Sequence, residues 1–236
     1  MIKAVLFDLD ATLLPMDQDL FLKTYLGSLA KKLSSYGYEP VKLVKAIWQG
    51  SYEMIKNDGS KTNEQVFWDY FAGVFGENVR SDEPYFDEFY RTDFKSVKSV
   101  CGYNPASKEI IRLLRKNGVR CVLATNPVFP AVATLERIDW AGLTPTSFEL
   151  ITTYENISYC KPNLKYYLNI AERLGLQPEE CLMVGNDVSD DMIAAETGMQ
   201  VFLLTDCLIN KDNIDISRYN RGGFDSLLDY IQNNVL

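Results

Sequence analysis

Residues 1–12 read MIKAVLFDLDAT, an apolar run from Ile2 to Phe7 that ends in two carboxylates, Asp8 and Asp10. A short apolar run bounded by polar residues is typical of a buried parallel strand. Side chains two residues apart share a face only while a strand continues. If the strand stops at Phe7 or Asp8, the chain turns and a backbone carbonyl can join the carboxylates around a hard cation such as Mg²⁺. The alternative is two acidic residues in an ordinary loop.

Three later runs have the same apolar character, and these are Val119 to Ala124, Cys181 to Val184, and Val201 to Leu204. Helical patterns accompany them, at Ser107 to Asn117, Pro162 to Leu174, and Asp190 to Thr197. Each predicted helix is followed by a glycine, which suits a helix C-terminus. Strands that alternate with helices predict an α/β fold: a Rossmann-like parallel sheet with helices on both faces. Functional groups are then expected at the carboxyl ends of the strands.

Residues 13–100 break this alternation, because the interval is too long for a loop and carries apolar stripes at helical spacing. We predict an inserted α-helical cap over 13–100 and an α/β core formed by 1–12 and 101–236. Thr62 and Gln65 have the spacing of a capping box at the start of one cap helix. Most cap rings are predicted to be core packing. Rings that reach the site would favour a nucleobase, whereas a cap Arg or Lys would favour a second acidic group on the substrate.

The composition narrows the possible functions. Of the 236 residues, 47% are apolar and 24% are charged, which is typical of a globular protein. The net charge is −8 and no long basic run occurs, so we expect no nucleic-acid partner. No segment approaches the roughly twenty apolar residues that span a bilayer, and no signal peptide is recognisable. We therefore expect a cytoplasmic protein with no membrane partner.

The chain contains no histidine and five cysteines. The lack of histidine excludes Ser-His-Asp hydrolases, histidine-nucleophile enzymes and histidine-ligated zinc enzymes. The cysteines are odd in number and show no C-x-x-C spacing, which argues against a disulfide framework and a zinc site. Any catalysis must therefore use carboxylates, lysines, hydroxyl groups and a metal ion.

Polar side chains follow the predicted strands in a distinctive order. Thr125 and Asn126 come directly after the second strand, where alone they would suggest a turn or a helix cap. Lys161 stands before Pro162, and the third strand leads into an acidic turn that contains Gly185, Asn186, Asp187 and Asp191. Because all these groups are expected at the same edge of the sheet, chance is a poor explanation for their order.

This order of motifs resembles the haloacid dehalogenase superfamily, in its phosphatase branch with an inserted helical cap, and the resemblance covers nearly the whole chain. It implies that Asp8 is a nucleophile that forms an aspartyl-phosphate, which water then hydrolyses. Asp10 would be the general acid and base. Thr125 would hydrogen-bond a phosphoryl oxygen and Lys161 would neutralise charge. The implied substrate-binding residues are Thr12, Thr125, Asn126 and Lys161.

The resemblance also implies Mg²⁺ as cofactor, with Asp8, Asp10, Asp187 and Asp191 as the residues that hold it. The sequence departs from the family pattern at two positions. Many relatives have Asp directly after Gly185, so Asn186 is an alternative ligand to Asp187 or Asp191. Relatives commonly have Gly where this chain has Ala11, a change that costs little unless the turn needs a positive φ.

The function implied is Mg²⁺-dependent hydrolysis of a small phosphorylated metabolite, a phosphomonoester such as a nucleotide, a sugar phosphate or a phosphoglycolate-like acid. One alternative is a phosphotransferase or phosphomutase, in which the cap excludes water. Another is a phosphonatase, which would need a cap lysine, and the candidates are Lys31, Lys32, Lys42, Lys45 and Lys56. A non-catalytic binding protein is the third. Asp10 disfavours the 2-haloacid dehalogenase branch, and both a monomer and a homodimer are compatible with the family.

Overall fold

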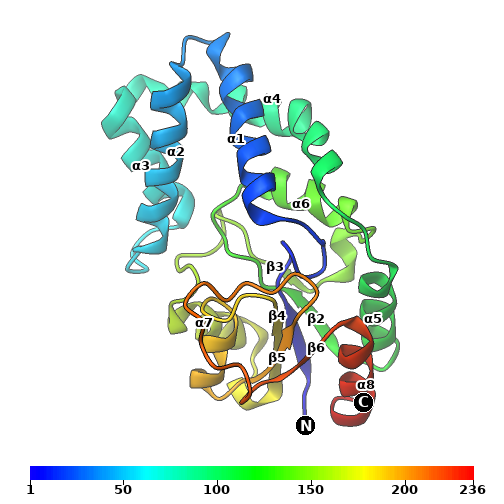
Figure 1. The fold of residues 1–236 in the computed structure, drawn as a ribbon. Helices are drawn as coiled ribbons and strands as arrows, with labels where there is room; N and C mark the ends of the chain where they lie inside the picture. Colours follow the sequence, from blue (N-terminus) through cyan, green and yellow to red (C-terminus); the bar gives the residue numbers. More distant parts are fainter.

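The centre of the molecule is a parallel sheet of six strands in the order β3-β2-β1-β4-β5-β6, in a computed structural model that describes all 236 residues (Figure 1). The strands are β1 (Ala4–Phe7), β2 (Arg120–Leu123), β3 (Leu150–Ile151), β4 (Cys181–Gly185), β5 (Gln200–Leu204) and β6 (Asn220–Gly222). This architecture confirms the predicted α/β fold. β1 pairs with both β2 and β4, so the carboxyl ends of these three strands lie side by side.

The two edge strands, β3 and β6, were not predicted. β3 has only two residues, and β6 is the polar sequence Asn-Arg-Gly, with two of its three residues exposed. β6 joins the sheet by parallel backbone pairing with β5, and Phe202 lies opposite Asn220. An edge strand that buries few side chains lacks the hydrophobic pattern by which strands are recognised in a sequence.

Four helices accompany the sheet: α5 (Pro105–Lys116), α6 (Ala131–Trp140), α7 (Leu164–Leu174) and α8 (Phe224–Asn234). α5 and α8 lie on one side of the sheet and α7 on the other (Figure 1). Two predicted helices need correction. α7 starts at Leu164 and not at Pro162, because Asn163 caps the helix by accepting from the Lys165 N–H at 3.0 Å. The segment predicted at 190–197 forms only a 3₁₀ helix, η5 (Met192–Thr197).

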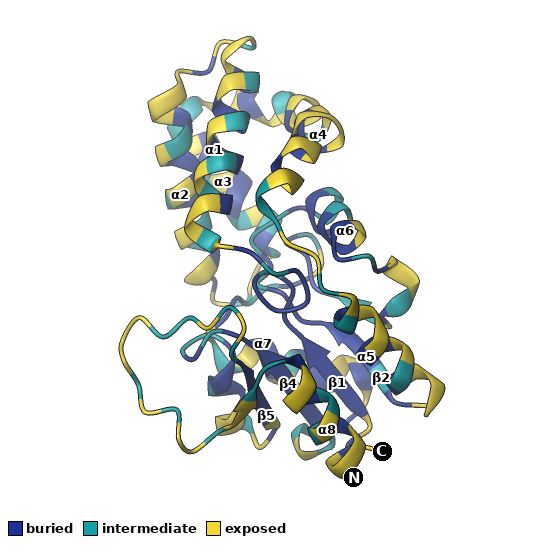
Figure 2. Ribbon diagram, turned by 45° about the vertical axis from the view of Figure 1, so that its right-hand side comes forward, coloured by how far each residue is buried: buried dark blue, intermediate teal, exposed yellow.

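Alternate residues of β1 serve two separate hydrophobic clusters. Val5 and Phe7 belong to a cluster shared with α5, α8 and the helical region of residues 13–100. Ala4 and Leu6 belong to a second cluster, on the side of α7. All four side chains are fully buried, as expected for a central parallel strand with helices on both faces (Figure 2). This burial fixes the position of β1, and Asp8 follows directly after its last residue.

Residues 13–100 contain α1 (Gln18–Ser34), α2 (Pro40–Ile55), α3 (Asn63–Phe75), η1 (Glu77–Asp82), α4 (Glu83–Arg91) and η2 (Asp93–Val100). The four α-helices lie together beyond the carboxyl edge of the sheet (Figure 1). The Thr62/Gln65 capping box at the start of α3 is confirmed. Most rings pack in the interior as predicted; Phe71, for example, is fully buried against Phe67, with ring centroids 5.3 Å apart. The residues at which the cap begins and ends remain a prediction.

No helix of the protein is both long and apolar enough to cross a bilayer. All five cysteines are free thiols.

Candidate active site

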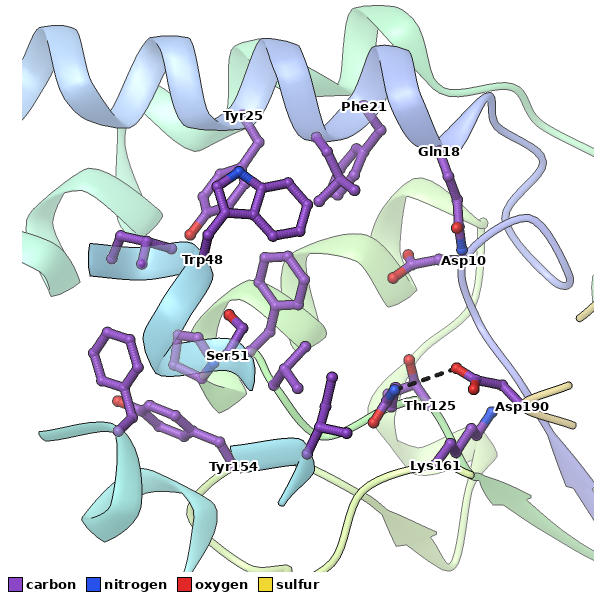
Figure 3. A pocket seen from close by; sticks show the side chains of 18 of the residues that line it. Asp10, Gln18, Phe21, Tyr25, Trp48, Ser51, Thr125, Tyr154, Lys161 and Asp190 are labelled. Atoms are coloured by element: carbon purple, nitrogen blue, oxygen red, sulfur yellow. Dashed lines mark hydrogen bonds between the residues drawn. The ribbon is translucent and has the colours of Figure 1, made fainter. Parts of the chain in front are cut away.

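A pocket of about 270 Å³ lies between the sheet edge and the cap helices (Figure 3). Its core wall includes Asp8 after β1, Thr125 after β2, and Asn186 after β4, together with Lys161. The pocket thus collects side chains that are far apart in the sequence, as the parallel sheet predicts. Figure 3 shows Asp10, Thr125, Lys161 and Asp190 on one side of the pocket, opposite rings from the cap.

Lys161 joins two carboxylates at the base of the pocket. Its Nζ donates to Asp8 Oδ1 at 2.9 Å and to Asp191 Oδ1 at 2.6 Å. All three residues are buried. Burial alone disfavours the ammonium form, but the negative charges of Asp191 and Asp8 outweigh it and raise the pKa of Lys161 well above its ordinary value. A permanent positive charge therefore sits beside the Asp8 carboxylate.

Gly185 makes room for this arrangement at the end of β4. A Cβ atom at this position would lie 2.1 Å from Asp191 Oδ2, far inside van der Waals contact. Asp191 Oδ2 also accepts from the backbone N–H of Asp187 at 3.0 Å, which fixes the carboxylate close to the strand end. A glycine here is thus needed for close approach.

Thr12 supports Asp8 from behind. Its hydroxyl lies 3.1 Å from Asp8 Oδ2 and 3.0 Å from Asn186 Oδ1, and it can donate its single proton to one of them at a time. Asn186 Nδ2 donates to the Cys207 carbonyl at 2.7 Å. Thr12 does not line the pocket, although we predicted it as a substrate-binding residue. The amide of Asn186 is likewise committed to protein partners, which weakens it as an alternative metal ligand.

Asp10 has a partner that the sequence analysis missed. Arg137 NH1 donates to Asp10 Oδ2, while Asp10 Oδ1 is buried with no hydrogen-bond partner. Burial raises the pKa of Asp10 even though the Arg137 charge acts in the opposite direction. The predicted general acid and base thus has one oxygen anchored and one oxygen free beside the pocket.

Arg137 is completely buried in α6, and its guanidinium carbon lies 4.1 Å from the centroid of the Phe129 ring. Its Nε donates to the Ala133 carbonyl at 3.3 Å. A buried guanidinium without a carboxylate partner would be strongly destabilising, so Asp10 and Arg137 depend on each other. Arg137 lies between Ala133 and Trp140 on the buried face of α6, and a charged residue on an apolar helix face is the signal that could have identified it. This helix was not predicted from the sequence.

Thr125 and Asn126 both reach the pocket wall, as predicted for substrate-binding residues. The Thr125 carbonyl accepts from the Thr152 hydroxyl at 2.7 Å and from the Tyr166 hydroxyl at 2.8 Å, which holds the loop rigidly. The Thr125 hydroxyl itself makes no hydrogen bond within the protein and remains available. Asn126 Oδ1 is buried without a partner, while its Nδ2 lies 3.5 Å from Asp190 Oδ2.

The donor chemistry of the pocket suits a divalent cation. Five aspartates line the pocket: Asp8, Asp10, Asp187, Asp190 and Asp191. Lys161 is the only basic residue that lines it. Carboxylates are the ligands that Mg²⁺ prefers. No three of them are gathered into a preformed metal-binding cluster, because Asp191 is paired with Lys161 and Asp10 with Arg137. One oxygen of Asp187 accepts from the Ser189 and Asp190 N–H groups, and the other has no partner in the protein.

The turn between Asp10 and Thr12 does require a positive φ. Ala11 adopts φ 60° and is almost completely buried. The left-handed region costs a non-glycine residue roughly 1 kcal/mol or more, so the methyl group is a real cost here. Ala11 N–H donates to the Leu14 carbonyl at 2.8 Å, which helps to hold the turn in this conformation.

Asp190 is expected to make the stability of the metal-free protein depend on pH. Burial, assisted by the negative charge of Asp187, raises the pKa of Asp190 from 3.8 to about 6. A carboxyl group whose pKa is raised by folding opposes folding once it ionises, so stability falls as pH rises from about 4 to about 6. The shift corresponds to at most about 3 kcal/mol.

The Asp190→Asn variant should therefore lose less stability than the wild type over this pH range. Urea denaturation in EDTA at several pH values gives the unfolding free energy of each protein. Asp10 and Asp191 are present in both proteins, so their contributions cancel in the difference between the two free energies. Parallel curves of unfolding free energy against pH would contradict the expectation.

The chain is similar in sequence and in fold to several known proteins. A family model described as haloacid dehalogenase-like hydrolase matches residues 2–198. The phosphoglycolate phosphatase of Nitrosospira multiformis is 24% identical over 206 residues, which cover 85% of this chain and 82% of that protein. The glyceraldehyde 3-phosphate phosphatase of Methanothermobacter thermautotrophicus is 24% identical over 231 residues, which cover 92% of this chain and 95% of that protein.

A crystal structure of a HAD phosphatase from Thermococcus onnurineus has the same fold, with a TM-score of 0.59 over 98% of both chains at 21% sequence identity. The family model covers β1, the cap helices, β2, β4 and the strand ends that form the pocket. The chain therefore belongs to the haloacid dehalogenase-like hydrolases.

Proposed function

We propose that this hydrolase cleaves phosphomonoesters through an aspartyl-phosphate at Asp8, with residues 13–100 as the cap that covers the site. The observation that carries the proposal is the charge pattern at the pocket base. The Asp8 carboxylate is buried beside Lys161, and the free oxygen of Asp10 lies at the same pocket. A nucleophile and a separate proton carrier are the two groups that a two-step ester hydrolysis needs.

Asp8 is well placed to act as the nucleophile because both of its oxygens are oriented. Lys161 contacts Oδ1 and Thr12 contacts Oδ2, so the carboxylate cannot rotate freely. Restricting a reacting group in this way lowers the entropic part of the barrier. Lys161 also offsets the repulsion between Asp8 and an anionic phosphate, and it would stabilise negative charge that develops during transfer.

Thr125 would bind a phosphoryl oxygen through its unpaired hydroxyl, held in place by the contacts that Thr152 and Tyr166 make to its carbonyl. Asn126 would assist from the next position. Thr12, which contacts Asp8 and does not line the pocket, would orient Asp8 and would not touch the substrate.

Asp10 would give its proton to the leaving oxygen in the first step and take a proton from water in the second. The raised pKa of Asp10 favours the protonated form that the first step requires. Arg137 acts as a positioning residue: it holds Oδ2 and leaves Oδ1 for the substrate side.

A divalent cation, Mg²⁺ by preference, would be held by Asp8 and Asp187, and Asp191 would contribute through a bound water because its two oxygens already accept from Lys161 and from the Asp187 N–H. Because the Asp10 side chain is paired with Arg137, we propose that Asp10 contributes through its backbone carbonyl. When bound, the cation would reduce the repulsion between the carboxylates and the phosphate. The unpaired oxygen of Asp187 is the protein group most available for this task.

Removal of divalent cations is expected to reduce phosphate release to background, because the five aspartates at the pocket are then balanced only by Lys161 and, at Asp10, by Arg137. Inorganic phosphate released from a panel of monophosphates is measured with Mg²⁺, with EDTA, and with EDTA followed by excess Mg²⁺. Full activity in EDTA would contradict the role given to the metal. Transfer of phosphate to a second position of the substrate, without release, would indicate a phosphotransferase or phosphomutase.

The phosphonatase alternative receives no support from the structure. It requires a cap lysine at the reaction centre, but the only lysine that lines the pocket is Lys161, from the core.

A further inference from the structure

The cap wall of the pocket contains no charged side chain. Thirteen residues from the cap line it, and they are Gln18, Phe21, Leu22, Tyr25, Leu26, Ile47, Trp48, Ser51, Ile55, Phe67, Trp68, Phe86 and Tyr90. Only Gln18 and Ser51 among them are neither aromatic nor aliphatic. The core adds further apolar surface, including Phe129 and Tyr154. The part of a substrate that extends away from Asp8 would therefore meet rings and aliphatic side chains.

No basic residue of the cap lines the pocket, and three of the cap lysines have partners elsewhere. Lys32 pairs with Glu88 at 2.8 Å on the outer surface. Lys42 and Lys56 lie over rings outside the pocket, 4.6 Å from the Phe75 centroid and 4.1 Å from the Tyr52 centroid respectively. A second anionic group on a substrate would find no cation on this wall, and a buried charge without a partner is strongly unfavourable.

One face of α2 supplies the wall with an exposed ring. Ile47, Ser51 and Ile55 recur at intervals of four residues and all line the pocket, with Trp48 beside them. Trp48 keeps 51% of its surface exposed, unlike the buried Phe67 and the other packed rings of the cap. Figure 3 shows Trp48, Tyr25 and Phe21 facing the cavity together. An exposed indole at a pocket wall is available to stack on a ligand ring.

Trp68 adds a polar requirement. It is 6% exposed and lines the pocket, and its indole N–H lies near the Tyr154 hydroxyl without making a well-formed hydrogen bond. A buried donor without an acceptor is destabilising, and a carbonyl or similar acceptor on a ligand would satisfy it.

We propose that the pocket selects phosphomonoesters whose leaving group is an uncharged aromatic ring that carries a hydrogen-bond acceptor. Leaving groups with a second negative charge, such as a carboxylate or another phosphate, are rejected. This selectivity rests on the proposed phosphatase function and specifies the substrate class of the same site. It separates this chain from enzymes whose substrate is a small phosphorylated acid.

The first test uses two substrates of similar shape that differ in charge, para-acetylphenyl phosphate and para-carboxyphenyl phosphate. Phosphoglycolate is the third substrate, and a reaction without substrate gives the background. Phosphate release with Mg²⁺ is expected to give kcat/KM about 100-fold higher for the acetyl compound, the size of effect that an unpaired buried charge produces. Phosphoglycolate is expected to be the poorest substrate of the three.

The second test introduces the missing charge. Ser51 is partly exposed on α2, so Ser51→Arg can place a cation on the pocket wall without disturbing the core. We expect this variant to reduce the preference for the acetyl compound by at least about tenfold, mainly by raising kcat/KM for the carboxylate. Ser51→Gln is the matched control, since it adds length without charge and should leave the preference unchanged.

Trp48 provides an independent measurement. Trp48→Ala is expected to lower kcat/KM for para-acetylphenyl phosphate about tenfold, within the range found when a stacking ring is removed. Trp48→Phe should restore most of the loss. Because Trp48 is half exposed, both variants should fold, which thermal denaturation can verify.

The outcomes distinguish a failure of the proposed phosphatase function from a failure of the inferred substrate class. If none of the phosphomonoesters releases phosphate, the proposed phosphatase function is overturned. If phosphate is released but the carboxylated compounds are hydrolysed as fast as the neutral one, the phosphatase stands and the inferred substrate class is wrong. Equal changes in Ser51→Arg and Ser51→Gln would contradict the charge argument specifically.

Discussion

Replacement of Asp8 by asparagine is expected to lower kcat for phosphate release by about 10⁴-fold or more, as loss of a nucleophile does in other covalent enzymes. The amide keeps the shape of the carboxylate: its oxygen can accept from Lys161 while its NH₂ group donates to the Thr12 hydroxyl, which can itself donate to Asn186. Lys161 retains Asp191 as an ionic partner, so the variant should fold. Steady-state phosphate release and thermal denaturation measure the two quantities separately.

Asp190→Asn is the matched control for Asp8. Asp190 is an aspartate of the same pocket that contacts Asn126 but neither Lys161 nor Thr12. Its replacement should change kcat less than about tenfold, because no step of the reaction is assigned to it. Asp8→Ala guards against deamidation of asparagine, which would regenerate the wild-type residue. Comparable activity in the Asp8 variants and the wild type would contradict the role of Asp8.

The second large effect is expected at Asp10. Asp10→Asn should lower kcat by about 10²- to 10⁴-fold, the usual contribution of a general acid and base. The amide oxygen can still accept from Arg137, but the buried guanidinium loses its carboxylate partner, so the stability of the variant is measured by thermal denaturation beside its activity. With para-nitrophenyl phosphate, whose leaving group needs little protonation, the first step should remain fast while hydrolysis of the intermediate slows. Rapid-mixing measurements should then show a burst of nitrophenol followed by slow turnover.

Arg137 gives a control that separates positioning from chemistry. The Arg137 charge opposes the rise in the pKa of Asp10, so Arg137→Met should raise that pKa further. In the pH profile of kcat/KM, which reports the first step, the limb on which activity falls as pH rises is then expected to move to higher pH, and Arg137→Lys should restore part of the shift. An unchanged pH profile in Arg137→Met, or the lack of a burst in Asp10→Asn, would contradict the pairing as a determinant of catalysis.

The central strands could be predicted because their side chains are buried on both faces. The apolar runs of β1, β2, β4 and β5 are the direct trace of that burial. β3 and β6 were not predicted, because these edge strands are held by backbone pairing, which leaves no pattern in side-chain polarity. α7 began later than predicted because Asn163 supplies the cap.

The core of the site could be predicted because each group follows directly from a strand end, as Asp8 and Thr125 do. Arg137 could not, since its partner Asp10 lies 127 positions away in the sequence and the two meet only in the folded protein. The rings that form the cap wall of the pocket could not be predicted either. Helical spacing shows that Trp48 and Trp68 lie on helices, but which ring remains exposed depends on how the helices pack.

The most direct test of the central claim is to trap the phosphorylated enzyme during turnover. Enzyme mixed with Mg²⁺ and substrate is quenched in acid, reduced with borohydride, and digested for peptide mass spectrometry, since an aspartyl-phosphate is reduced to homoserine. The account predicts homoserine at position 8 and at no other aspartate, with more of it in the Asp10→Asn variant when the substrate is para-nitrophenyl phosphate. Unmodified Asp8 in samples quenched during active phosphate release, or homoserine at another position, would contradict it.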